Sequence, residues 1–322
     1  MYAELLLSLI IVVIGCELFT NGIEWVAYRY RISACATGSL FAAVGTAFPE
    51  TILPIIAIFF AKEGGDEIGI GAILGAPFML SSLAMFMGGL TIILATLGGR
   101  RKIKLNIDTT HIKLDLLYFM IAYTLIVLVS LFLHPFRDLL AFLLVVIYVV
   151  YAFKLLRVEG EIECSECGLY IGKISQSRNL DIIQTIVGLV LIWTGAKLFV
   201  DELSAVSHSI GIPLFILSFL LSPVATELPE KLNSVLWYWR GKDTLALGNI
   251  TGAMIFQATF PVAIGMIFTQ WNLGVVELIS ITLTLVSCLI LYLYILIKKE
   301  LCAYIMLVGG IIYLLYFLLV FL

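Results

Sequence analysis

Long apolar segments, each close to the length of a membrane span, recur along the whole chain and alternate with short segments that carry the charged residues. A helix of about 20 predominantly apolar residues crosses a bilayer. The pattern therefore predicts an all-α polytopic protein of the cell membrane, with lipid as its surroundings. Ten transmembrane helices are expected, at residues 4–26, 32–60, 68–98, 114–133, 138–156, 180–200, 212–238, 244–269, 273–297 and 301–321.

The cationic residues alternate between loops. The even-numbered loops and the two termini hold only Lys62 and Arg137. Because cytoplasmic loops carry the excess of Lys and Arg, both termini are predicted to lie outside, as an even number of spans requires. The odd-numbered loops hold Arg29, Arg31, Arg100, Arg101, Lys102, Lys104, Lys113, Lys154, Arg157, Lys173, Arg178, Arg240, Lys242, Lys298 and Lys299.

Composition supports the membrane class and narrows the chemistry. Hydrophobic residues make up 62% of the chain and charged residues 13%, whereas a soluble domain has about 25% charged residues. We find no phosphate-binding loop, no nucleophile triad and no nucleic-acid patch, since topology explains the basic loops. The sequence therefore predicts neither an enzyme, nor a cofactor, nor a nucleic-acid partner.

The second and seventh predicted spans are interrupted by prolines at matching places. Proline removes a backbone donor and frees a carbonyl one turn back. At membrane depth, freed backbone groups persist only where protein or a polar cavity surrounds them. A shift of 180 residues superposes the segment 46–50 on 226–230, and a shift of 177 superposes 71–76 on 248–253.

These matches divide the chain into two repeats of five spans. The first repeat covers residues 1–156, a cytoplasmic linker covers 157–179, and the second repeat covers 180–322. Because five is odd, the two repeats enter the membrane from opposite sides. Inverted repeats of this kind are found in many secondary transporters, whose ion sites lie near the midplane at discontinuous helices.

Glu50 and Glu230 occupy matching positions inside apolar segments, each directly after a proline. A carboxylate at that depth is a functional-site hypothesis. Two carboxylates would neutralise Ca²⁺, which takes about six to eight oxygen ligands. Thr46 and Thr226, four residues earlier, share the helical faces of the glutamates, and their hydroxyls or nearby freed carbonyls could complete the shell.

Other readings remain open for these polar residues. Glu50 and Glu230 could instead form a protonated, hydrogen-bonded structural pair. Glu227 is a third ligand, a proton carrier or a residue that lines the cavity. Lys231 adjoins Glu230 and either pairs with a carboxylate or competes with the cation. Gln257 offers a neutral oxygen, with interhelical hydrogen bonding as its alternative.

The linker contains the motif Cys164-Ser165-Glu166-Cys167. One C-x-x-C supplies two of the four ligands that a structural zinc site needs. A second copy of the chain could supply the other two, which would make a zinc-bridged contact. We favour the reading of a reduced, solvated loop.

The motif Gly45-Thr46-Ala47-Phe48-Pro49-Glu50 resembles the G-T-S-x-P-E of the first alpha repeat of sodium/calcium exchangers. The segment 226–230 is similar to the second copy, and 248–257 resembles that family's G-N-x-x-G-S-N-x-F-D stretch. The resemblance implies ten spans with outside termini. It implies these cation ligands: Thr46, Glu50, Thr226, Glu230 and, in place of an acidic ligand, Gln257; Glu227 joins them as a candidate.

The chain departs from the family pattern at positions that supply polar groups. Ala47 and Glu227 replace the serines after the two threonines, and Leu80 stands near the place of an asparagine ligand. Apolar residues also replace the serines and asparagines of G-S-N, at Ala76, Pro77, Ala253 and Met254. These departures leave the counter-ion and the stoichiometry open.

Together these features predict a secondary active antiporter. We expect it to exchange Ca²⁺ for Na⁺ or H⁺ by alternating access at a midplane carboxylate site. The alternatives are an exchanger of another cation with H⁺, and a cation channel without exchange.

Overall fold

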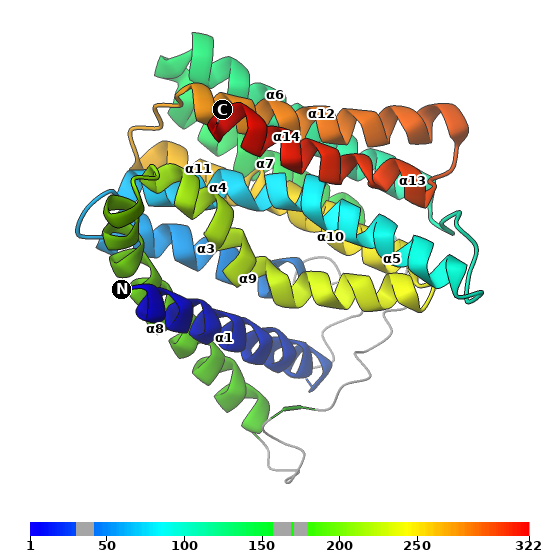
Figure 1. Ribbon diagram of the computed structural model, residues 1–322, viewed down its shortest axis with the longest axis horizontal. Coiled ribbons are helices and arrows are strands. Elements are labelled where there is room, and N and C mark those ends of the chain that lie inside the picture. The colour runs from blue at the N-terminus through cyan, green and yellow to red at the C-terminus, as the bar shows by residue number, and fades with distance from the viewer. Residues whose placement is uncertain (30–41, 157–168, 171–178, 322) are drawn as a thin grey trace. The chain divides into compact units, whose positions relative to one another are not determined.

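The computed structural model describes residues 1–29, 42–156, 169–170 and 179–321; within these ranges, the side chains at 24, 27–29, 42–48, 154–156 and 228–230 lie outside the description. The regular elements in the described ranges are helices (Figure 1). In chain order they are α1 (Tyr2–Arg29), α3 (Ala42–Phe60), α4 (Gly65–Met79), η2 (Leu80–Ala84), α5 (Met85–Leu97), α6 (Thr109–Phe132), η3 (His134–Phe136), α7 (Arg137–Leu156), α8 (Leu180–Ile210), α9 (Leu214–Trp239), α10 (Asp243–Gln257), α11 (Phe260–Phe268), α12 (Val275–Lys298), α13 (Ala303–Met306) and α14 (Val308–Phe321).

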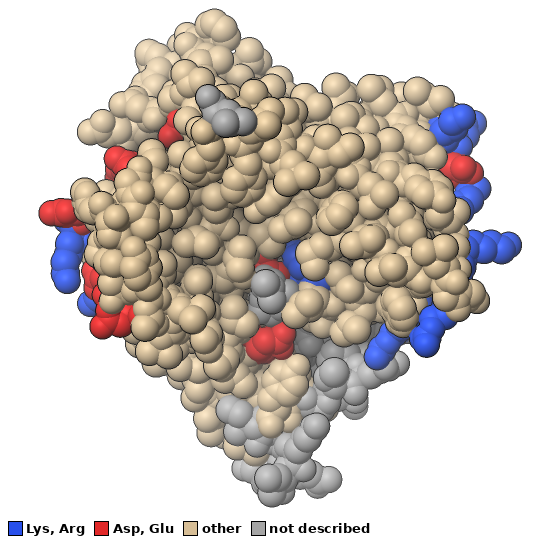
Figure 2. Space-filling view, in the orientation of Figure 1, with Lys and Arg blue, Asp and Glu red and all other residues tan. Residues whose placement is uncertain are grey.

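The described helices confirm the multi-pass membrane class. Eight helical segments in the described ranges are long and apolar enough to cross a membrane. Two shorter apolar helices, Pro49–Phe60 and Leu214–Glu227, lie where the second and seventh spans are predicted. Figure 2 shows charged side chains mainly near the edges of the visible face, with a broad uncharged surface between them. The number of ten spans stays a prediction.

The chain forms two compact units. Unit 1 comprises Met1–Ile73 and Tyr148–Pro229, and unit 2 comprises Leu74–Ile147 and Glu230–Leu322. Each unit thus draws on both halves of the sequence. The division into repeats at 1–156 and 180–322 concerns internal similarity and stays a prediction.

Unit 1 is built around the close packing of α1 against α8. A Cβ added at Gly188 of α8 would lie 2.5 Å from the backbone nitrogen of Phe19 and 2.9 Å from the carbonyl oxygen of Gly15. Small residues permit such an approach of two backbones, which is a common means of helix association in membranes. α3 packs against both helices, and its buried Leu53 and Ile56 belong to the same apolar core.

Unit 2 is built around α6, which packs against α10 and α12, while α14 and α10 pack against η2. The helix from Gly65 to Leu97 contains a π-helical turn at η2, just after Pro77. The eighth predicted span breaks after Gln257, and α11 begins with Phe260 and Pro261. Proline explains both irregularities, because it cannot donate the helical hydrogen bond.

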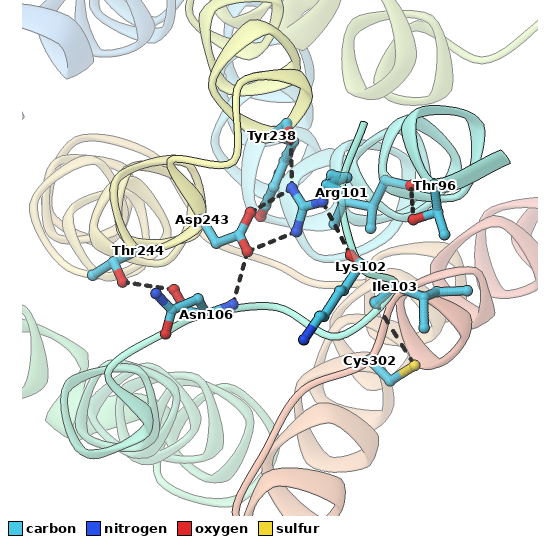
Figure 3. Close-up of polar contacts among 10 residues, drawn as sticks. Thr96, Arg101, Lys102, Ile103, Asn106, Tyr238, Asp243, Thr244 and Cys302 are labelled. Carbon is cyan, nitrogen blue, oxygen red and sulfur yellow. Dashed lines mark hydrogen bonds and ion pairs between the residues drawn. The ribbon is translucent and has the colours of Figure 1, made fainter. Parts of the chain in front are cut away.

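In unit 2 the loops segregate to the two ends of α6. Before α6, the third loop bonds to the ninth through Leu105 N and Leu301 O at 3.0 Å, and Arg101 pairs with Asp243 at the seventh loop (Figure 3). After α6, the fourth loop meets the eighth, where Arg137 Nη1 donates to Gln270 O at 2.9 Å. Odd-numbered and even-numbered loops thus lie at opposite ends, as alternate crossings require.

Unit 1 shows the same segregation. The N-terminal amine of Met1 lies 3.5 Å from Glu202, and Lys62 of the second loop lies 3.8 Å from Asp201, near the end of α8. At the start of α8, Tyr170 of the fifth loop donates its hydroxyl to Glu17 near the far end of α1, at 3.3 Å. Which end faces the cytoplasm stays a prediction from the positive charges.

Candidate cation site

Glu50 lies inside α3 and is buried, with 5% of its surface exposed. Pro49 and Pro54 stand within this apolar helix, so backbone carbonyls one turn before each lose their helical donor. The residues that follow Glu50 are buried in the core of unit 1, among them Leu53 and Ala57. The carboxyl group therefore stands at an interrupted helix in apolar surroundings, which makes any charge on it costly without a cation or a donor nearby.

α9 supplies the second group of polar residues in unit 1. Glu227 is fully buried, and Thr226 is 5% exposed. The Thr226 hydroxyl donates to the carbonyl oxygen of Ser222 at 3.2 Å. A hydroxyl that donates one hydrogen bond keeps its lone pairs for an acceptor role, so this oxygen can still face a cation.

The structure brings Glu50 and Glu227 into the same part of unit 1. The buried thiol of Cys16, in α1, lies within electrostatic range of both carboxyl groups and of Glu17. The alanine before Thr226, Ala225, belongs to the same apolar core as Leu53 of α3. Elements that are far apart in sequence therefore place two acidic side chains in one buried region.

Two of the predicted ligands cannot be placed as side chains. Thr46 lies on α3 and Glu230 on α9, but both side chains are outside the described part of the chain. The same holds for Cys164 and Cys167, which fall outside the described residues altogether. Among the described residues, no group of three or more His, Cys, Asp or Glu side chains is arranged to hold a metal ion. The roles of these residues stay predictions.

In unit 2, Gln257 is the last residue of α10 and is 1% exposed. The internal match places it on Leu80, the first residue of η2, and α10 packs against η2. The two helix irregularities of the repeats therefore meet within this unit. Gln257 presents an amide where its counterpart presents an apolar side chain.

Hydroxyl groups bind carbonyls at both irregularities. Ser81 Oγ donates to Phe78 O at 3.1 Å, and Ser82 donates to the same oxygen. In the second repeat Thr259 Oγ1 lies 2.8 Å from Ile255 O and 3.0 Å from Phe256 O. Side-chain hydroxyls commonly satisfy backbone groups that proline frees in a membrane helix.

Asn249 of α10 links two helices. Its amide nitrogen donates to the Ser234 hydroxyl of α9 at 3.1 Å. This contact is an interhelical hydrogen bond, a common use of asparagine within membranes.

One buried carboxylate escaped the sequence analysis. Asp115 of α6 is 6% exposed and accepts a hydrogen bond of 2.6 Å from the Thr251 hydroxyl of α10. The predicted span began at residue 114, so Asp115 would have lain at the membrane surface. The helix instead begins at Thr109, with the Asp108 side chain accepting from Thr110 N as an N-cap. The N-cap pattern, an aspartate before two threonines, was the signal that could have placed Asp115 deeper.

A second polar cluster was also missed, between α1 and α8. Gln184 Nε2 donates to Asn21 Oδ1 at 2.8 Å and to Leu18 O at 3.1 Å. Gln184 and Asn21 are both buried. Single amides carry no recognisable spacing, and only the packing of the two helices shows that they face each other.

Comparison with known proteins reveals relatives along the whole chain. The family described as "Sodium/calcium exchanger protein" matches residues 2–157 and 180–322. An uncharacterized membrane protein of Methanocaldococcus jannaschii, MJ0091, is 25% identical over 289 residues, which is 90% of this chain and 88% of the relative.

Solved structures share the fold. The H⁺/Ca²⁺ exchanger CAX superposes with a TM-score of 0.80 at 16% identity, covering 100% of this chain and 82% of the exchanger. The sodium-calcium exchanger NCX_Mj, soaked with 10 mM Na⁺ and zero Ca²⁺, gives a TM-score of 0.61 at 22% identity, covering 98% of this chain and 96% of that structure. At these identities the likeness concerns the fold alone.

Proposed function

Because the chain belongs to the sodium/calcium exchanger family, a family of membrane antiporters, we propose that it exchanges Ca²⁺ for H⁺ or Na⁺ by alternating access. The carrying observation is the pair of buried acidic residues Glu50 and Glu227 near Cys16 in unit 1. Apolar surroundings make such groups bind either protons or a cation, and exchange follows when one replaces the other.

We propose that the cation is held by carboxylates from both proline-interrupted helices, completed by neutral oxygens. Ca²⁺ accepts about six to eight oxygens in a flexible shell, so hydroxyl and amide oxygens are suitable additions to carboxylates. Buried Thr226 and Gln257 support this assignment. The proposed ligands are Thr46, Glu50, Thr226, Glu227, Glu230 and Gln257, in ten spans arranged as two inverted repeats.

For the counter-ion we favour H⁺ over Na⁺. Side chains at positions where the family pattern has serine or asparagine are apolar and buried here, namely Ala76 at 4%, Ala253 at 5% and Met254 at 1% exposure. A sodium ion that gave up its hydration shell would find fewer oxygens at these positions. Protons need only the carboxyl groups themselves.

The test is ⁴⁵Ca²⁺ uptake into proteoliposomes under an imposed pH gradient or Na⁺ gradient. We expect uptake driven by the pH gradient and abolished in Glu50→Gln and in Glu230→Gln. Glu63→Gln removes an exposed carboxylate outside the long helices and should leave uptake intact. Uptake driven only by Na⁺ would change the counter-ion, uptake without either gradient would indicate a channel, and folded protein without any uptake would refute calcium transport.

A further inference from the structure

Lys231 is a lysine inside α9 with only 3% of its surface exposed. Among the described residues no other lysine is buried to this degree. An ammonium ion without water is stable only beside negative charge or strong acceptors. The chain must therefore supply such a partner, and the partner should lie close by.

The nearest acidic side chain by helix geometry is that of Glu227. Glu227 precedes Lys231 by four residues on the continuous helix α9 and is fully buried. Side chains four residues apart share a helix face, and glutamate before lysine is the favourable order for an ion pair. Each residue has the charge that compensates the burial of the other.

We infer that Lys231 acts as a tethered counter-charge that sets the cation site to the charge of one divalent ion. This inference rests on the exchange site proposed above. Glu50, Glu227 and Glu230 contribute three negative charges and Lys231 one positive charge, so the set has a net charge of minus two. That charge is neutralised by one Ca²⁺ or by two protons. The ammonium makes a monovalent companion ion unnecessary.

The inference predicts that charge balance matters more than either side chain. Glu227→Gln leaves the ammonium beside the site and reduces the net charge to minus one. We expect it to weaken Ca²⁺ binding at least roughly tenfold, since a buried charge then lacks its partner. The double variant Glu227→Gln/Lys231→Met restores minus two and should bind Ca²⁺ to within about threefold of the wild type.

Lys231→Met alone leaves minus three, so a divalent ion no longer completes the neutralisation. We expect added Na⁺ to strengthen Ca²⁺ binding by this variant and not by the wild type. Lys231→Arg keeps the charge and should resemble the wild type more closely. Lys197→Met removes an exposed lysine of α8 and serves as the matched control, with no change expected.

The measurement is calorimetric titration of the purified full-length variants with Ca²⁺, with melting temperature as the check on folding. Rescue by the double variant supports the inference. A double variant that binds no better than Glu227→Gln overturns it, while wild-type binding leaves the proposed exchanger standing. A folded wild type that binds none of Ca²⁺, Sr²⁺ and Mn²⁺ overturns the proposed function and this inference together.

Discussion

The guanidinium of Arg101 and the carboxylate of Asp243 form a two-pronged ion pair, with Nη1 2.6 Å from Oδ1 and Nη2 2.7 Å from Oδ2 (Figure 3). The backbone N–H of Asn106 adds a third hydrogen bond to Asp243, at 2.8 Å. Arg101 also donates to the carbonyl of Tyr238 at the end of α9. The contact joins the loop before α6 to the first turn of α10, the helix that ends in Gln257.

Arg101→Ala should destabilise the protein markedly. The side chains of Arg101 and Asp243 are only 9% and 2% exposed, and removing one partner of a buried pair costs about 3–5 kcal/mol. Arg101→Lys should recover only part of the loss, because an ammonium cannot make the two parallel bonds. Melting in detergent, followed by intrinsic fluorescence, measures the effect.

Arg100→Ala is the control for that comparison. Arg100 is exposed and stacks its guanidinium 5.1 Å from the ring centre of Trp239, a contact worth about 0.5–1 kcal/mol at an exposed site. Equal losses in the two alanine variants would contradict the importance of the ion pair.

Thr251→Val should reduce stability and transport together. The change preserves shape but removes the hydroxyl that donates to buried Asp115, and a buried acceptor without its donor costs about 1–3 kcal/mol. α10 would be held less firmly against α6, which we expect to misplace Gln257. Thr251→Ser keeps the hydroxyl and should retain most of the uptake.

Thr244→Val provides the comparison. The Thr244 hydroxyl is exposed and bonds to Asn106 O at 3.2 Å, so its loss should be small. The measurements are melting temperature and ⁴⁵Ca²⁺ uptake in proteoliposomes. If Thr251→Val behaved like Thr244→Val, the bond to Asp115 would have no part in holding α10.

Gly188→Ala should destabilise the packing of α1 on α8. The new Cβ would fall 2.5 Å from a backbone nitrogen of α1, so the helices themselves must separate and lose packing contacts. In Gly248→Ala the added Cβ meets nothing within 4 Å, and alanine in a helix is favoured over glycine by about 0.5–1 kcal/mol. Opposite shifts of the two melting temperatures are expected; a stable Gly188→Ala would show that the helices can separate at little cost.

The predicted orientation can be tested with single cysteines. Lys62 and Lys102 are exposed in loops two and three, so Lys62→Cys should react with a membrane-impermeant maleimide on intact cells and Lys102→Cys should not. Both should react after lysis. Cys164 and Cys167 are replaced by serine in both proteins. The reverse pattern would place the termini inside, and labelling of both residues on intact cells would contradict alternate crossings between them.

Local chemistry made much of the architecture readable from the sequence. Each helix must bury its backbone groups in lipid, so apolar length alone indicated where the helices lie. Proline acts within one turn of its own position, and the irregular helices at η2 and after Gln257 accordingly follow the matching segments 71–77 and 248–254. The acidic residue Glu50 stood out because it interrupts an apolar run.

Contacts between distant segments could not be read in this way. The sequence by itself determined the membrane class, the helical segments and the candidate carboxylates, because hydrophobicity and backbone geometry are local properties. Only the tertiary structure decided that Thr251 donates to Asp115, that Gln184 meets Asn21 and that Arg101 reaches Asp243. Each of these pairs depends on which helix faces come together, and that choice is made by the packing of the whole chain.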